Sequence, residues 1–291
     1  MKFFADTASI PEIGYCFSRG ANQGITTNPR ILELTGDLSL GFEGACKAIV
    51  SRYPDVPISL ETDLRGFDVL KFDEIDPHLV RDSLLQQAYR LSEFGDNVVV
   101  KIPFCAGGIL ATKELSKRGI KTNVTATMDS NQALCAAAAG ATYTNIFVNR
   151  RLDFEILKLA GHNIFLMMTY PSWKDVVAGE KSRYGETAWD ITLKDMAYAS
   201  RELESTGTSL IGASLRDPSD ILRIATTKPQ VITIPTNILK GLEANLEGLK
   251  QSERTYQSNE PAADVPIYSH PMTLRTLLDF EKAADSYRKR V

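Results

Sequence analysis

Short apolar runs alternate with longer amphipathic segments along most of the chain. Eight of these runs are rich in β-forming residues and have the length of strands: residues 3–6, 24–27, 57–62, 97–102, 121–126, 143–148, 209–213 and 231–234. Seven intervening segments carry apolar residues at helical spacing: residues 11–20, 40–53, 77–94, 107–118, 130–140, 192–205 and 218–227. This repetition of strand and helix predicts right-handed βαβ units and a parallel sheet.

Eight such units in 291 residues predict an α/β fold, a (β/α)8 TIM barrel formed by residues 1–291 as a single domain. A doubly wound open sheet is the alternative, but no Gly-x-Gly-x-x-Gly motif follows the first strand. We expect residues 153–190 to form an insertion between strands six and seven, as a lid or an oligomer contact. Residues 250–266 are polar and rich in turn formers, which indicates a loop before a helical C-terminal tail at 267–291.

Composition and charge narrow the class of protein. Hydrophobic residues make up 43% of the chain and charged residues 24%, with a formal net charge of -3 and no run rich in Lys or Arg. These values argue against a nucleic-acid partner and against an anionic membrane. No signal peptide and no apolar stretch near the roughly 18 residues of a membrane span is present, so we expect a soluble, cytoplasmic protein. The four cysteines and three histidines lack metal-ligand spacing, which predicts buried thiols and no metal site.

In a barrel of this kind, catalytic groups lie at the carboxyl ends of the strands. Almost every predicted strand ends in side chains suited to chemistry, and residues two apart along a strand point to the same side. Along the chain these side chains are Asp6, Thr26, Asn28, Glu61, Lys101, Asn123, Thr125, Asn145, Phe147, Ser214 and Arg216. We therefore expect them to converge at one mouth of the barrel.

Lys101 is the sharpest candidate for catalysis. It follows three valines and precedes an Ile-Pro pair, so its amine is expected to emerge from an apolar wall. Desolvation disfavours the ammonium form, which lowers the pKa of the amine and supplies a nucleophile for a carbonyl carbon. A strand-end lysine can instead reach solvent or pair with a carboxylate, Asp6 fits a helix N-cap, and Glu61 fits a surface ion pair. The three together favour catalysis, because attack by an amine needs carboxyl groups that move protons.

Arginines after the sixth and seventh strands are candidates for anion binding. Guanidinium and hydroxyl groups near the last strands are where barrels hold phosphate, which favours Arg150, Ser214 and Arg216. The alternative is that these are solvated loop charges. We expect Arg151 to be solvated.

Six motifs in register carry a resemblance to a known family. They are Asp6-Thr7-Ala8, Gly24-Ile25-Thr26-Thr27-Asn28-Pro29, Val99-Val100-Lys101-Ile102-Pro103, Lys121-Thr122-Asn123-Val124-Thr125-Ala126-Thr127, Phe147-Val148-Asn149-Arg150 and Gly212-Ala213-Ser214-Leu215-Arg216. The chain resembles the transaldolases and the related fructose-6-phosphate aldolases over its first half and again from about residue 192 onward.

The resemblance implies a Schiff-base enzyme that acts on small sugar phosphates without a metal or an organic cofactor. Lys101 would form the Schiff base with C2 of a ketose, and Asp6 would exchange a proton with the C4 hydroxyl. Glu61 and Thr125 would hold the water that shuttles protons. The residues around the dihydroxyacetone unit would be Thr26, Asn28, Asn123, Asn145 and Phe147. Those that bind the phosphate would be Arg150, Ser214 and Arg216.

The reaction itself has alternatives. Glu61 and Phe147 resemble the transaldolase residues, whereas the similar aldolases that release free dihydroxyacetone carry Gln and Tyr there. Phe147 has no hydroxyl to help protonate an enamine, which favours transfer to an aldose phosphate. Asn145 and Asn149 depart from the Ser and Gly of the family pattern, so an unusual ketose is a further alternative, and a non-catalytic sugar-phosphate-binding barrel is another. The terminal helix resembles tails that pack on neighbouring subunits, so we expect a homo-oligomer.

Overall fold

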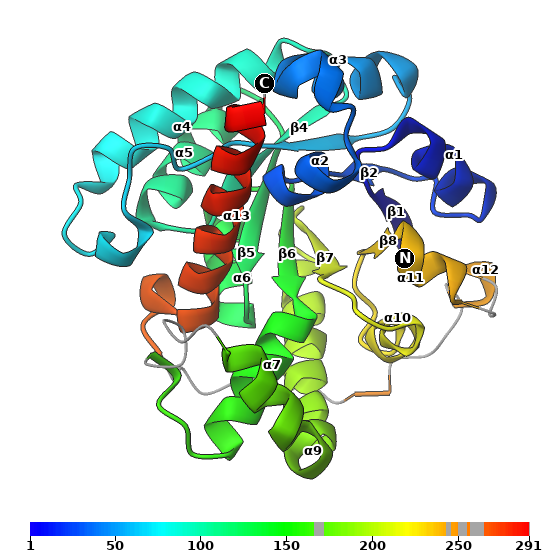
Figure 1. The fold of residues 1–291 in the computed structure, drawn as a ribbon, viewed down its shortest axis with the longest axis vertical. Helices are drawn as coiled ribbons and strands as arrows, with labels where there is room; N and C mark the ends of the chain where they lie inside the picture. The colour runs from blue at the N-terminus through cyan, green and yellow to red at the C-terminus, as the bar shows by residue number, and fades with distance from the viewer. Residues whose placement is uncertain (166–171, 243–245, 250–254, 257–264, 291) are drawn as a thin grey trace.

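The computed structural model describes residues 1–165, 172–242, 246–249, 255–256 and 265–290. Eight parallel strands pair in chain order into a closed barrel, and β8 closes onto β1, which confirms the predicted (β/α)8 TIM barrel (Figure 1). The strands are β1 (Lys2–Asp6), β2 (Ile25–Thr26), β3 (Ile58–Glu61), β4 (Val98–Pro103), β5 (Thr122–Thr127), β6 (Tyr143–Phe147), β7 (Ser209–Ala213) and β8 (Val231–Pro235). All eight overlap the predicted strands.

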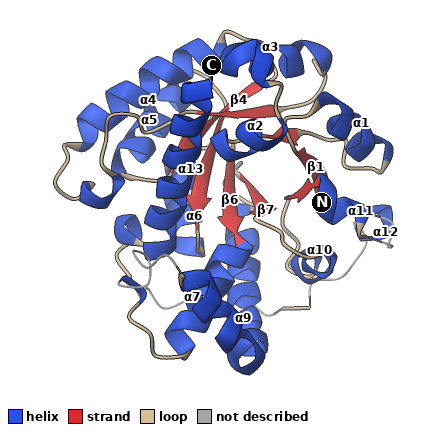
Figure 2. Cartoon of the chain, viewed as in Figure 1, coloured by secondary structure: helices blue, strands red, loops and turns tan. Residues whose placement is uncertain are grey.

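Helices surround the barrel and connect its strands (Figure 2). They are α1 (Ile10–Ser18), α2 (Pro29–Thr35), α3 (Gly41–Arg52), α4 (Pro77–Ser92), α5 (Ala106–Lys117), α6 (Ser130–Ala138), α7 (Val148–Leu159), α9 (Trp173–Leu203), α10 (Pro218–Ala225), α11 (Thr236–Lys240), α12 (Leu246–Leu249) and α13 (Pro271–Arg290). Three short 3-10 helices add to these: η1 (Leu38–Leu40), η2 (Val69–Lys71) and η3 (Ile267–Ser269). The sequence did not predict α2, α7, α11 or α12, and three of these four are too short to show a helical period.

Among the described residues, α7 and α9 lie between β6 and β7, where the sequence predicted an insertion. The first, α7, follows β6 without a loop and packs against α9. The second, α9, is 31 residues long and begins at Trp173, well before the predicted start at residue 192. Its first half presents many charged side chains, but Trp173, Val177 and Ala188 are buried. Residues 166–171 of the predicted insertion lie outside the described residues.

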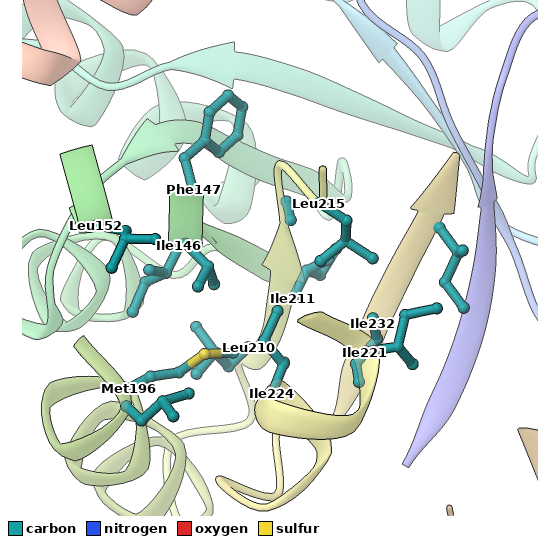
Figure 3. Close-up of a cluster of buried hydrophobic side chains, with 14 of the residues drawn as sticks. Ile146, Phe147, Leu152, Met196, Leu210, Ile211, Leu215, Ile221, Ile224 and Ile232 are labelled. Carbon is teal, nitrogen blue, oxygen red and sulfur yellow. The ribbon is translucent and has the colours of Figure 1, made fainter. Parts of the chain in front are cut away.

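Alternate residues of each strand face the helices and the barrel interior. Among the outward side chains, Ile146 and Leu210 belong to one cluster with Met196 of α9 and Ile224 of α10 (Figure 3). In the same view Phe147, the last residue of β6, points away from that group. The apolar layer between strands and helices thus stabilises the barrel, while the interior near the strand ends is left to polar side chains.

The C-terminal tail packs on its own barrel. Helix α13 contacts β5 and the elements that follow β2, β3 and β6, namely α2, η2 and α7. It crosses in front of the strands in Figure 1. At its start, the backbone N–H of Met272 donates to Nδ1 of His270 at 3.2 Å, and Oγ1 of Thr273 donates to the carbonyl oxygen of Ala126 at 3.0 Å. Most of the predicted loop at 250–266 lies outside the described residues. None of the described helices is both long and apolar enough to cross a membrane.

Candidate active site

Lys101 lies inside the barrel near the carboxyl end of β4, with 3% of its surface exposed. Its Nζ is 2.8 Å from Oε2 of Glu61 and donates a hydrogen bond of 3.0 Å to the carbonyl oxygen of Thr27. Glu61 is the strand partner of Lys101 on β3, and Asn123 is its partner on β5. Three candidate site residues therefore lie next to one another at one level of the barrel.

The apolar wall expected around Lys101 faces away from it. Val98 and Val100 belong to an outer cluster with apolar side chains of α4 and α5. Because residues alternate along a strand, Lys101 points to the opposite side, where its neighbours are Glu61 and Asn123. The expectation that the flanking valines form a wall around the amine is therefore corrected: Lys101 is buried, but a carboxylate and a carbonyl oxygen contact its nitrogen.

Two buried carboxyl groups near Lys101, those of Glu61 and Asp6, have shifted pKa values. Burial raises the pKa of Glu61 to about 7, although the charge of Lys101 and its hydrogen bond oppose the rise. Burial also raises the pKa of Asp6, while a hydrogen bond from Thr26 and the charge of Lys101 lower it. Both carboxyl groups are thus within electrostatic reach of Lys101. A pKa near 7 lets Glu61 accept and return a proton at neutral pH.

Hydroxyl groups hold Asp6 from the side of β2 and β8. Oγ1 of Thr26 donates to Oδ1 of Asp6 at 2.6 Å and is 2.5 Å from Oγ1 of Thr233. A hydroxyl has one proton, so Thr26 accepts from Thr233 while it donates to Asp6. Asn28, expected to contact substrate, caps α2, because its Oδ1 accepts from the backbone N–H of Ile31 at 2.8 Å. The side-chain nitrogen of Asn28, Nδ2, can still donate a hydrogen bond to a ligand.

Amide side chains form a short chain across the barrel. Nδ2 of Asn145 donates to Oδ1 of Asn123 at 3.0 Å, and Nδ2 of Asn123 donates to Oγ of Ser59 at 3.0 Å. Oδ1 of Asn145 and Oγ1 of Thr125 are buried and have no hydrogen-bond partner within the described ranges. Leaving such an atom unpaired costs about 1–3 kcal/mol, a cost that a substrate hydroxyl or a water molecule removes. These two atoms are therefore candidates for ligand contacts.

A phenylalanine ring of the terminal helix lies over Lys101 and contacts a second phenylalanine. Phe147 is 8% exposed and meets Phe280 of α13 edge to face, with ring centroids 6.1 Å apart. The centroid of the Phe280 ring is 5.8 Å from Nζ of Lys101. Phe147 was predicted at the site and Phe280 was not.

Each arginine predicted to bind phosphate contacts a carboxylate. Nη2 of Arg150 is 2.8 Å from Oδ2 of Asp279 on α13. Arg216 forms two hydrogen bonds with Asp153, of 2.7 and 2.5 Å. Asp153 lies one turn after Arg150 on α7, so the carboxylate that holds Arg216 is on the same face of that helix as Arg150.

The loop after β7 presents Ser214 and Arg216. Ser214 has a φ of 66°, in the left-handed region. Burial lowers the pKa of Arg216, but the hydrogen bonds and charge of Asp153 outweigh this and raise it. Oδ2 of Asp220 accepts from the backbone N–H of Arg216 at 2.8 Å and from Nδ2 of Asn149 at 2.7 Å, and Asn149 also donates to the carbonyl oxygen of Ser214 at 2.9 Å. Asn149, which departs from the family pattern, therefore stabilises this loop through hydrogen bonds.

Arg151 is buried, with 5% of its surface exposed, so the prediction that it is solvated is wrong. Its guanidinium is 2.6 Å from Oε1 of Glu155 and 3.8 Å from Oδ2 of Asp129. Asp195 of α9 lies nearby: burial raises its pKa to about 6, and the charge of Arg151 opposes the rise. The sequence placed Arg151 in a loop, whereas the structure places it in the first turn of α7, which packs against α9.

Sequence reasoning missed three side chains at the site: Asp153, Asp279 and Phe280. The spacing of three residues between Arg150 and Asp153 was a usable signal, since it places both on one helix face. Nothing in the sequence indicated which face of the tail meets the barrel, so Asp279 and Phe280 had no comparable signal. Within the part of the chain that the structure describes, no group of three or more His, Cys, Asp or Glu side chains could hold a metal ion.

The closed (β/α)8 barrel holds a buried lysine and glutamate in contact near its strand ends, the place where enzymes of this fold have their active sites. A family model described as Transaldolase/Fructose-6-phosphate aldolase matches residues 3–289. A probable transaldolase of Myxococcus xanthus (strain DK1622) is 32% identical over 244 residues, which cover 83% of this chain and 86% of that protein. A probable transaldolase of Hydrogenobaculum sp. (strain Y04AAS1) is 33% identical over 242 residues, 83% of this chain and 88% of its own. The chain belongs to the transaldolase/fructose-6-phosphate aldolase family.

Proposed function

We propose that the protein is a transaldolase, which transfers a dihydroxyacetone unit from a ketose phosphate to an aldose phosphate through a Schiff base on Lys101. The observation that carries this proposal is the contact of 2.8 Å between the buried Lys101 amine and Glu61, whose pKa is raised to about 7. A carboxylate of that basicity can take a proton from the ammonium group and leave the free amine that attacks a carbonyl carbon. Membership of the family supports the same chemistry.

The covalent intermediate forms in two steps. The amine of Lys101 adds to C2 of the ketose, and the resulting carbinolamine then loses its hydroxyl as water to give a protonated imine. That loss needs a proton donor, and protonated Glu61 supplies the proton through a bound water molecule. The free Oγ1 of Thr125 supports this role, because it can hold the same water without giving up another hydrogen bond.

Cleavage and transfer use the second carboxyl group. Asp6 takes the proton of the C4 hydroxyl, the C3–C4 bond breaks, and its electron pair moves toward the imine to form an enamine on Lys101. Burial, which raises the pKa of Asp6, makes it a better base. The aldose phosphate formed by the cleavage leaves, and the enamine attacks the aldehyde of the acceptor while Asp6 returns the proton to the new hydroxyl. Water then hydrolyses the imine and frees Lys101. The protonated imine is the electron sink, so these steps use neither a metal nor an organic cofactor.

A lyase that releases free dihydroxyacetone is the second candidate within the family. Release requires a proton on C3 of the enamine before an acceptor arrives. Phe280, which lies over Lys101, and Phe147, which contacts Phe280, have no proton to give and would keep water away, and this favours transfer. A transaldolase for an unusual ketose is a variant of the first proposal that the carboxamide of Asn145 favours, since its free Oδ1 adds an acceptor beside the dihydroxyacetone unit.

Reductive trapping tests the covalent step. Sodium borohydride with fructose 6-phosphate should leave a stable adduct on Lys101, located by peptide mass spectrometry. The adduct should disappear in Lys101→Ala and persist in Lys121→Ala, a control at an exposed lysine of the neighbouring strand connection. If no six- or seven-carbon ketose phosphate gives an adduct on Lys101, the proposal is lost.

A second assay separates transfer from cleavage. Fructose 6-phosphate is incubated with and without erythrose 4-phosphate, and glyceraldehyde 3-phosphate is measured. Continuous turnover should require the acceptor. Equal rates without it identify the lyase instead. The expected homo-oligomer is a separate prediction, which light scattering tests.

A further inference from the structure

Asp279 lies between two arginines on the face of α13 that meets the barrel. Its Oδ2 is 2.8 Å from Nη2 of Arg150, and its Oδ1 is 3.3 Å from Nε of Arg275, one turn earlier on the same helix. The side chains of Arg150, Asp279 and Arg275 are 15%, 30% and 18% exposed. The guanidinium proposed to hold the substrate phosphate is therefore already neutralised by a carboxylate of its own chain.

The pair at the second arginine is built differently. Asp153 is 2% exposed and contacts both terminal nitrogens of Arg216, whose side chain is 45% exposed. A buried carboxylate that holds a guanidinium at two points fixes its orientation and leaves the outer edge toward solvent. Asp153 thus positions Arg216, whereas Asp279 holds Arg150 through one oxygen and is itself accessible. Only the contact of Asp279 can be exchanged without exposing a deeply buried charge.

We propose that Asp279 is a specificity-determining residue, because it competes with the phosphate group of the substrate for Arg150. This inference rests on the proposed function, in which Arg150 binds that phosphate. A phosphate monoester carries about 1.5 to 2 negative charges at neutral pH and three acceptor oxygens, so it displaces a single carboxylate. After displacement Asp279 keeps Arg275 as its partner, and no charge is left unpaired.

Arg150 has a second terminal nitrogen that can donate to the phosphate. Its Nη1 is buried and has no hydrogen-bond partner among the residues that the structure describes. A phosphate oxygen can accept from Nη1 while another takes the place of Asp279 at Nη2, which gives the two-point contact that guanidinium groups favour. Before the substrate binds, each of the two arginines proposed to hold the phosphate contacts an aspartate of its own chain. Binding of phosphate is therefore weaker than two uncompensated arginines would make it.

The variant Asp279→Asn tests the competition, since it keeps the shape of the side chain and removes its charge. Inorganic phosphate is the probe, titrated by calorimetry in a phosphate-free buffer at neutral pH. Phosphate should bind about three- to tenfold more tightly to the variant, as expected for the loss of one partly exposed competing ion pair. Asp279→Glu should behave as the wild type does, because it retains the charge. Asp285→Asn, which changes an exposed carboxylate of the same helix, is the matched control.

The KM values for two acceptor substrates distinguish lost competition for phosphate from a general change in packing. In Asp279→Asn, KM should fall for glyceraldehyde 3-phosphate and stay unchanged for unphosphorylated glyceraldehyde. Equal phosphate affinity in the variant and the wild type overturns the inference, and so does an equal change of KM for both acceptors. Phosphate that binds to neither protein also overturns it. The borohydride adduct on Lys101 reports separately on the proposed function, so the two can fail independently. If Asp279→Asn does not fold, Asp279→Ser removes the same charge.

Discussion

Replacing Glu61 by Gln should change how the stability of the protein depends on pH. In the folded protein the pKa of Glu61 is about 7, against 4.5 for an ordinary glutamate, because the side chain is buried. The folded state thus favours the protonated form. The stability that this group contributes is fully present below about pH 4.5 and is lost as the pH rises through 7.

The magnitude follows from the two pKa values. Each tenfold change in proton affinity corresponds to about 1.4 kcal/mol, so the rise from 4.5 to about 7 corresponds to about 3 kcal/mol of unfolding free energy. Gln at this position does not titrate. Part of this change occurs below pH 5, so the unfolding free energy of Glu61→Gln, taken relative to wild type, should increase by about 2 to 3 kcal/mol between pH 5 and pH 8. Asp195 also loses stabilisation as the pH rises, but it is present in both proteins and cancels in the difference.

Urea unfolding followed by tryptophan fluorescence provides the measurement, because Trp173 and Trp189 are both buried. Wild type, Glu61→Gln and the control Glu93→Gln, at an exposed glutamate, are compared at several pH values between 5 and 8. The control should follow the wild type throughout. A difference between Glu61→Gln and wild type that stays constant with pH would refute the reasoning. It would mean that Glu61 is ionised over this whole range and is no proton acceptor for Lys101 at neutral pH.

Three further predictions concern turnover. Thr125→Val should lower kcat by about ten- to a hundredfold with little change in KM, because the water that carries protons loses a hydrogen-bond partner. An unchanged kcat in steady-state assays would contradict this role for Thr125. Asp153→Asn should raise KM for phosphorylated acceptors by about tenfold, since Arg216 loses its fixed orientation; an equal rise for unphosphorylated acceptors would show a general defect. Phe280→Ala should increase the release of free dihydroxyacetone relative to transfer, because water reaches the enamine, and an unchanged product ratio would exclude a shielding role for this ring.

The order of strands could be read from the sequence because each strand is a short apolar run with a polar residue at its end. The same pattern predicted that Glu61, Lys101 and Asn123 lie close together, and the structure places them at matching positions on adjacent strands. The alternation along β4 was also available, and it places Val98 and Val100 on the face opposite to Lys101. The expectation of an apolar wall overlooked this alternation, although the residues themselves implied it.

Other features depend on contacts between segments far apart in the chain. Helical spacing showed that the tail has an apolar face, but it could not show that Phe280 would meet Phe147 or that Asp279 would meet Arg150. The burial of Arg151 likewise depends on how α9 lies across α7. Periodicity predicts that an element has a buried side, and only the packing of the whole barrel decides what that side contacts.

The two carboxyl groups near Lys101 are suited to different protons because their surroundings differ. Glu61 contacts the amine directly, so its proton exchange is tied to the charge on nitrogen. Asp6 has one oxygen engaged by the hydroxyl of Thr26, which stabilises its ionised form and leaves the other oxygen for a substrate hydroxyl. A buried ion pair cannot react until its proton has moved from Lys101 to Glu61. The energy of that transfer is set by how far burial raises the pKa of Glu61, which links the stability of the barrel to the nucleophile it carries.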